Sequence, residues 1–167
     1  MSKMTDDAKK ERRLYEPVRK LLSETLKTKS PEIHLEITAD KLFSNKLKSK
    51  VGDNRDIIFL FLKEAAPDII GFIKEQYSSA FIVVEIKSEK LKLDDIYQTR
   101  KYADLFDAKY ALLVTSEEIP EELKRLSRVV FSLLYIGSYR TFSLVQFDEK
   151  NNAFVEYFPE NPFSKAS

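Results

Sequence analysis

The sequence contains no cysteine and a single histidine, His34, in 167 residues. Without cysteine there is no disulfide, no thiolate nucleophile, and no ligand for a cysteine-bound zinc or an iron–sulfur cluster. One histidine also excludes a metal site built from several histidines and argues against a Ser-His-Asp triad. The chemistry left to the chain uses carboxylates and amines, and oxygen-ligated cations are the cofactors that suit these groups.

Glycine is scarce as well, at three residues, and neither GxGxxG nor GxxxxGK[ST] occurs, so the usual phosphate-binding loops are absent. The longest uninterrupted apolar run, from Ile57 to Leu62, has six residues, whereas a membrane-spanning helix needs about 20. The charged N-terminus lacks the apolar segment of a secretory signal. We therefore expect a cytoplasmic protein without membrane association.

The overall composition is that of a folded domain. Hydrophobic residues make up 43% of the chain and charged residues 33%, which allows a buried core beneath a well-solvated surface. The length suits one domain covering residues 1–167.

The net charge of +1 is unevenly distributed. Residues 1–29 carry nine Lys and Arg against five Asp and Glu, and residues 41–55 carry five against one. Such segments either contact phosphates or form solvated faces of the fold. The basic residues that we expect to contact nucleic acid are Lys46, Lys48, Lys50, Lys90, Lys92, Arg100 and Lys101.

Hydrophobic periodicity predicts alternating helices and strands. Residues 41–50 fit a helix, residues 57–66 fit either a helix or a strand, and Pro17 lies inside the first helical pattern, where it predicts a kink or a new start. The predicted helices cover residues 6–27, 94–107 and the segment after Pro120, and the predicted strands cover 33–38, 68–74, 81–87, 109–115, 131–136 and 140–147.

Two predicted hairpins define the architecture. The strands at 68–74 and 81–87 flank a polar turn, and those at 131–136 and 140–147 flank a turn at Gly137. With helices between the other strands, this order predicts an α/β fold with a mixed β-sheet flanked by helices.

Asp68, Glu85 and Lys87 are the strongest candidates for chemistry. Side chains alternate along a strand, so Glu85 and Lys87 share one face, and Asp68 opens the partner strand close to Glu85. Two neighbouring carboxylates repel each other, and a divalent cation relieves that repulsion. Mg²⁺ suits few carboxylates with a backbone carbonyl, here that of Ile86, and retained waters. Lys87 could then orient a metal-bound water or neutralise developing charge.

These residues resemble a known superfamily. Pro67-Asp68 and Glu85-Ile86-Lys87 match the motif of the PD-(D/E)xK nucleases. Gln98 and Tyr102 resemble the QxxxY element of RecB-type exonucleases, and Glu11 resembles the glutamate of the first helix in the superfamily. The resemblance covers about residues 11–115.

The resemblance implies a restriction-endonuclease-like fold with a core at about residues 11–147. The chain departs from the compact family pattern by an insertion at about residues 40–57. The resemblance also implies a nuclease that depends on Mg²⁺ or Mn²⁺, with DNA as a more probable substrate than RNA. Asp68, Glu85 and the Ile86 carbonyl would bind the metal ion, Lys87 would act on the water, and Glu11, Gln98 and Tyr102 would support the site.

Other functions remain open at this point. The chain could be a non-catalytic nucleic-acid-binding or regulatory protein that retains the nuclease fold, or a component of a defence or mobile-element complex that acts as a homodimer or with a partner protein. Each candidate residue also has a structural explanation: a turn for Asp68, an ion pair for Glu85 and Lys87, helix packing for Gln98 and Tyr102, and a solvated charge for Glu11.

Overall fold

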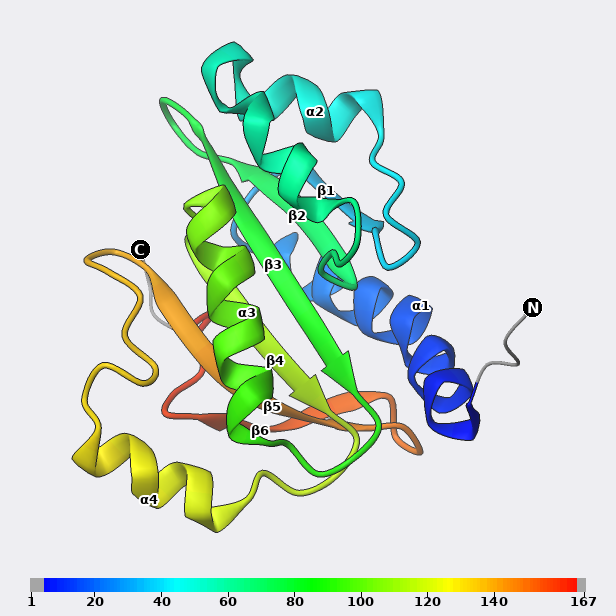
Figure 1. Cartoon of the computed structure of the whole chain (residues 1–167), viewed down its shortest axis with the longest axis vertical. Coiled ribbons are helices and arrows are strands. Elements are labelled where there is room, and N and C mark those ends of the chain that lie inside the picture. The colour runs from blue at the N-terminus through cyan, green and yellow to red at the C-terminus, as the bar shows by residue number, and fades with distance from the viewer. Residues whose placement is uncertain (1–4, 165–167) are drawn as a thin grey trace.

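The computed structural model describes residues 5–164. Helices and strands alternate in the order expected for an α/β fold (Figure 1). The elements are α1 (Asp6–Leu26), β1 (Ile33–Ile37), α2 (Asn45–Val51), the 3₁₀ helix η1 (Asp53–Leu62), β2 (Ile69–Lys74), β3 (Ser79–Lys87), α3 (Leu93–Phe106), β4 (Tyr110–Thr115), α4 (Glu121–Val129), β5 (Thr141–Asp148) and β6 (Ala153–Phe158).

The six strands form one sheet in the order β1-β2-β3-β4-β5-β6. Strands β3, β4 and β5 are parallel to one another, and the remaining neighbours pair antiparallel. All six residues of β4 are buried, as expected for an inner strand with both faces covered. The predicted α/β fold with a mixed sheet is confirmed.

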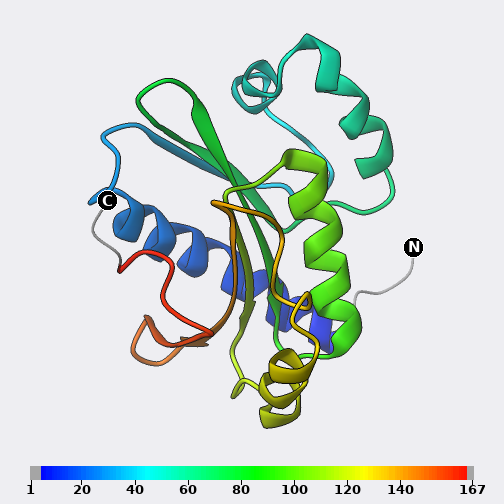
Figure 2. The same cartoon turned by 90° about the vertical axis from the view of Figure 1, so that its left-hand side faces the viewer.

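Helices cover both faces of the sheet (Figure 2). One core lies between the sheet and α1, and it includes Val84 and Ile86 of β3. The second core, which includes Val83, lies between the other face and α3, with α2, η1 and α4 at its borders. Side chains alternate along β3, so Glu85 and Lys87 share the face of Val83. That is the face of the sheet covered by α3.

Helix α1 begins after Thr5, whose hydroxyl accepts a hydrogen bond from the Ala8 amide at 3.2 Å. A buried stripe, Leu14, Val18, Leu22 and Leu26, runs along its inner face. The helix continues through Pro17 without a new start. A proline removes one backbone hydrogen bond, and the buried stripe on both sides of it holds the helix together. Among the helices within residues 5–164, none has the length and hydrophobicity to cross a membrane.

The connection between β1 and β2 differs in detail from the prediction. Helix α2 begins at Asn45 rather than 41, because the Ser44 hydroxyl accepts a hydrogen bond from the Leu47 amide at 3.0 Å and caps the helix. The ambiguous segment 57–66 belongs mainly to η1, which buries Ile58 and Leu62. The extra structure between β1 and β2 thus extends past residue 57 to Leu62.

The predicted strand at 131–136 is wrong. This segment forms turns, and Arg100 of α3 donates hydrogen bonds to the carbonyl oxygens of Ser132, Leu133 and Tyr135. A guanidinium group thus takes the place of a neighbouring strand as hydrogen-bond donor. Strand β5 instead pairs parallel with β4 and antiparallel with β6. The sheet therefore continues beyond residue 147, to Phe158.

Candidate active site

Asp68 and Glu85 lie side by side at the point where β2 begins and β3 nears its end. The antiparallel register pairs Ile69 with Val84, which places the preceding Asp68 beside Glu85. The Asp68 amide donates a hydrogen bond to Oε1 of Glu85 at 3.1 Å. The Ile86 amide donates to Oδ2 of Asp68 at 2.7 Å. The predicted proximity of the two carboxylates is confirmed.

Thr38, which the sequence did not single out, fixes the backbone that carries Asp68. Its hydroxyl donates a hydrogen bond to the Pro67 carbonyl at 2.6 Å, and its amide donates to the Asp68 carbonyl at 2.8 Å. The Thr38 side chain is fully buried. The only sequence signal was a polar residue directly after the alternating pattern of β1, and many loop residues share that signal.

Helix α1 brings two side chains to the carboxylates. The Tyr15 hydroxyl donates a hydrogen bond to Asp68, and burial followed by the charge of Asp68 raises the pKa of Tyr15, so this donor keeps its proton. Glu11 lies one helical turn earlier, half-buried and close enough to Lys87 for their charges to interact. Tyr15 was missed, although its spacing of four from Glu11 places both on one face of the helix.

The two carboxylates carry more negative charge than their surroundings compensate. Asp68 is 8% exposed and Glu85 is 4% exposed. Burial raises the pKa of Asp68 to about 6, even though it accepts hydrogen bonds from Ile86 and Tyr15. Burial and then the charge of Asp68 raise the pKa of Glu85 well above its ordinary value. A cation bound between them would remove this excess.

The positive charge of Lys87 acts on both carboxylates and on Glu11. Burial lowers the pKa of Lys87, but the charges of Glu85, Glu11 and Asp95 outweigh it and raise the pKa overall. Its Nζ lies 3.7 Å from Oδ1 of Asp95, in the first turn of α3. Lys87 is therefore a protonated donor here, held from the opposite side by a carboxylate that the sequence did not single out.

Gln98 and Tyr102 share one face of α3, as the spacing of four predicted. Nε2 of Gln98 donates a hydrogen bond to the Tyr102 hydroxyl oxygen at 3.3 Å. Tyr102 is fully buried. Burial raises the pKa of its hydroxyl, and the charges of Glu85 and Asp68 add to the effect. Tyr102 is thus near enough to Glu85 and Asp68 for their charges to act on its hydroxyl.

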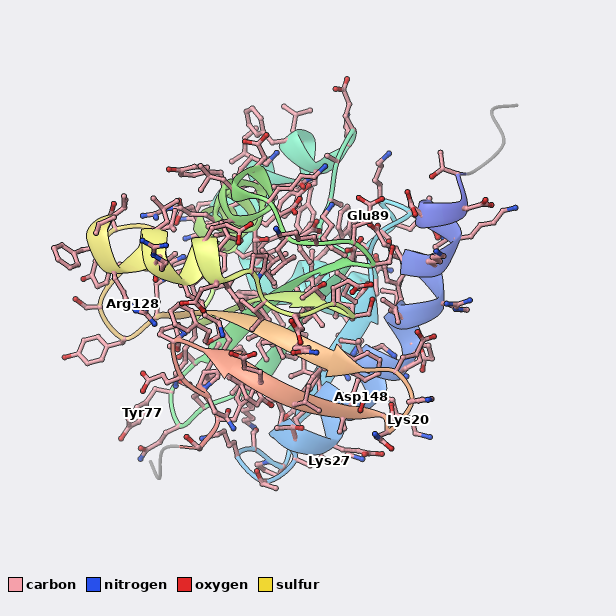
Figure 3. The ribbon with its side chains drawn as sticks, turned by 90° about the horizontal axis from the view of Figure 1, so that it is seen from below. Lys20, Lys27, Tyr77, Glu89, Arg128 and Asp148 are labelled. Atoms are coloured by element: carbon pink, nitrogen blue, oxygen red, sulfur yellow. The ribbon has the colours of Figure 1, made fainter. Side chains whose placement is uncertain are left out.

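A cavity of about 250 Å³ adjoins the site where Lys87 leaves the sheet. Its walls come from the first two turns of α1, the β3–α3 connection and Asp95. Glu89, labelled in Figure 3, lines it near the start of α1, where its carboxyl is hydrogen-bonded to that of Asp7. The cavity is a route by which a solute reaches Lys87 and Glu11, which both line it.

The basic residues selected from the sequence fall into three groups. Lys46, Lys48 and Lys50 are exposed on α2, where Nζ of Lys50 lies 5.3 Å from the centroid of the Phe72 ring. Lys90 and Lys92 line the cavity beside Lys87. The remaining two make contacts within the fold: Arg100 with the 131–136 segment, and Lys101 with the Tyr102 ring at 5.0 Å.

The donor set fits Mg²⁺ better than a metal that needs many protein ligands. No group of three or more His, Cys, Asp or Glu within residues 5–164 is arranged to hold a metal ion. Two carboxylates remain. The Ile86 amide points to Asp68, and the carbonyl of a strand residue points to the same edge as its amide, so the Ile86 carbonyl could join them as a ligand. Mg²⁺ is commonly held by one or two carboxylates and keeps several waters.

Comparison with known proteins finds no relative: no family model, no curated protein and no solved structure matches the chain. The assignment of this site therefore depends on its own geometry and on the motif in the sequence.

Proposed function

We propose that the protein is a Mg²⁺- or Mn²⁺-dependent nuclease of restriction-endonuclease-like fold that hydrolyses phosphodiester bonds, with DNA as substrate. One observation carries the proposal: the buried Asp68–Glu85 pair, with raised pKa values, beside Lys87 at the end of an inner strand. Burying two like charges is costly unless something compensates them. A cation bound between the two carboxylates would compensate the energetic cost of burying them.

The residues divide the work between them. Asp68, Glu85 and the Ile86 carbonyl would hold the cation, which supplies a water of lowered pKa and draws negative charge from the phosphate. Lys87, protonated and beside Glu85, would orient the attacking water or neutralise charge that develops on the phosphate oxygens. Asp95 pairs with the Lys87 ammonium group and the charge of Glu11 acts on it, while Tyr15 and Thr38 hold Asp68 in place.

A second function, nucleic-acid binding without cleavage, has support from a different part of the molecule. Lys46 and Lys48 are exposed on α2 and form no ion pair within residues 5–164. Uncompensated lysines on one short helix suit contacts with phosphates. This surface serves either function, so it does not distinguish between them.

The deciding experiment measures cleavage and metal binding on the same preparation. Linear duplex and single-stranded DNA are incubated with Mg²⁺, Mn²⁺ or EDTA, and thermal unfolding is recorded under the same conditions. We expect cleavage with either metal ion, none with EDTA, and a rise in melting temperature with metal. DNA binding without cleavage, together with a melting temperature that ignores both metal ions, would instead establish the binding function.

A further inference from the structure

Helix α4 carries a charge gradient along its exposed face. Glu121 and Glu122 occupy its first turn, and Arg128 its last. Arg125 lies between them on the same side, and all four are exposed, whereas Leu123 faces the core. The Glu121–Arg128 pair is 3.7 Å apart, with both side chains more than 60% exposed. Such a surface pair contributes little to stability, so these charges can exchange partners at small cost.

The segment after this helix presents an apolar side chain to solvent. Phe131 is 84% exposed, and Val129 before it is 74% exposed. The backbone beneath is fixed by Arg100, which donates hydrogen bonds to the carbonyl oxygens of Ser132, Leu133 and Tyr135. An exposed aromatic ring on a backbone held in one conformation loses little entropy on binding, as in the anchor residues of protein interfaces.

A hollow suited to such a ring lies at the other end of the same helix. It has a volume of about 350 Å³ and is lined by Lys90, Leu91, Lys92, Leu93, Glu122 and Leu123. Leu93 is 39% exposed there. Nζ of Lys90 lies 2.6 Å from Oε1 of Glu122, so an ion pair joins α4 to the loop that forms the other wall. The two walls of the hollow are thus already held together in a single copy of the chain.

We propose that this surface binds a second copy of the chain, with the two α4 helices antiparallel about a two-fold axis. In that arrangement the acidic first turn of each helix faces the basic last turn of its partner, and Phe131 of each copy lies near the hollow of the other. A two-fold interface uses the same patch on both copies and must be self-complementary. The α4 surface meets this condition in two ways. Its acidic first turn complements its basic last turn, and Phe131 at one end complements the hollow at the other.

The position of α4 makes such a contact accessible. The helix stands at the margin of the molecule, beyond the end of the sheet (Figure 1), and Arg128 is labelled on it in Figure 3. The proposal does not depend on nuclease activity. It has a consequence for the candidate active site, however, because Lys90 and Lys92 line both the hollow and the cavity beside Lys87.

The first test measures the mass of the full chain by sedimentation velocity over a series of protein concentrations. We expect a reversible dimer in the wild type and a dissociation constant about tenfold or more higher for Phe131→Ala, as for loss of an interface anchor. Tyr77→Ala is the matched control, because Tyr77 is 91% exposed on the distant β2–β3 turn. A monomeric wild type, or equal effects of the two substitutions, would overturn the proposal.

The second test exchanges the charges. One variant carries Arg125→Glu and Arg128→Glu, so that its α4 face is wholly acidic; the other carries Glu121→Lys and Glu122→Lys. Each variant alone should be monomeric, because like charges then face each other, and an equimolar mixture should form a heterodimer. If either variant dimerises as well as the wild type, or if the mixture stays monomeric, the antiparallel arrangement of α4 is wrong.

Discussion

Two regions of the molecule bury charged side chains, and they compensate those charges differently. Directly before β5, Arg140 has a side chain that is 17% exposed and donates hydrogen bonds to the carbonyl oxygens of Ala103, Ala108 and Ile136. At the end of β3, Asp68 and Glu85 are buried against each other, and burial raises the pKa of both. The arginine has neutral acceptors and two carboxylates, Asp104 and Asp107, within 4 Å, whereas the carboxylates have too few positive or donor groups.

Arg140 is a charge that the fold compensates, whereas Asp68 and Glu85 are charges that it does not. Arg140 keeps a loop in place by donating to the carbonyl oxygens of Ala108 and Ile136, and its removal would take this donor away from both. Asp68 and Glu85 already hold backbone amides, yet their negative charge exceeds what the fold needs for that purpose. Excess buried charge of one sign is what perturbed pKa values in catalytic and metal sites reflect.

The largest expected effect is on cleavage. Glu85→Gln should lower kcat by about 10³-fold or more, because it removes charge from the cation site, and Lys87→Met should lower it by about 10²- to 10³-fold while metal binding persists. Single-turnover cleavage and calorimetric Mn²⁺ binding measure the two effects. Glu24→Gln, at an exposed position of α1 outside the cavity, is the control and should cleave at nearly the wild-type rate. Equal activity of all three variants would place the chemistry elsewhere.

The next effect is on stability at the arginine region. Arg140→Met should lower the free energy of unfolding by about 2 kcal/mol or more, because the carbonyl oxygens of Ala108 and Ile136 lose their side-chain donor. Urea denaturation provides the measurement. Arg13→Met, at an arginine that is 65% exposed and paired with Glu149 at 3.4 Å, should change the value by less than about 0.5 kcal/mol. A similar small change for both would remove the structural role of Arg140.

Asp68→Asn should act in the opposite direction. The pKa of Asp68 rises from 3.8 to about 6 on folding, so the folded state favours the protonated acid. Its stabilising contribution is complete below pH 4 and is lost as pH rises through 6, which amounts to about 3 kcal/mol. The neutral asparagine avoids this loss and keeps an acceptor for the Ile86 amide.

The variant should therefore match the wild type near pH 4 and be more stable by about 2–3 kcal/mol at pH 8, without Mg²⁺. Urea denaturation at both pH values tests this difference. A variant that is less stable than the wild type at pH 8 would show that the Asp68 charge is structural, like that of Arg140.

The smallest effect concerns DNA binding by the exposed lysines. Replacing Lys46, Lys48 and Lys50 with alanine should reduce the slope of log affinity against log salt by about one unit for each lost phosphate contact, with little change in stability. Arg100→Gln serves as the comparison: its guanidinium binds the 131–136 segment, so stability should fall and the slope should stay constant. An unchanged slope in the triple variant would make α2 a solvated face.

Local patterns predicted much of the sheet and of the candidate site. Alternation in β3 placed Glu85 and Lys87 on one face, and the short hairpin placed Asp68 beside Glu85. The spacing of four on α3 brought Gln98 to Tyr102. These features depend on residues near one another in the sequence or across one tight connection, so strand and helix periodicity are sufficient to predict them.

What the sequence could not reveal depends on contacts between distant segments. Thr38, directly after β1, holds the backbone at Asp68, Tyr15 reaches Asp68 from α1, and Asp95 meets Lys87 from α3. The segment 131–136 has the composition of a strand, yet Arg100 supplies the donors that a strand would need, and β6 takes the place beside β5. Periodicity gives the face of an element, but only packing decides which partner satisfies its hydrogen-bonding groups.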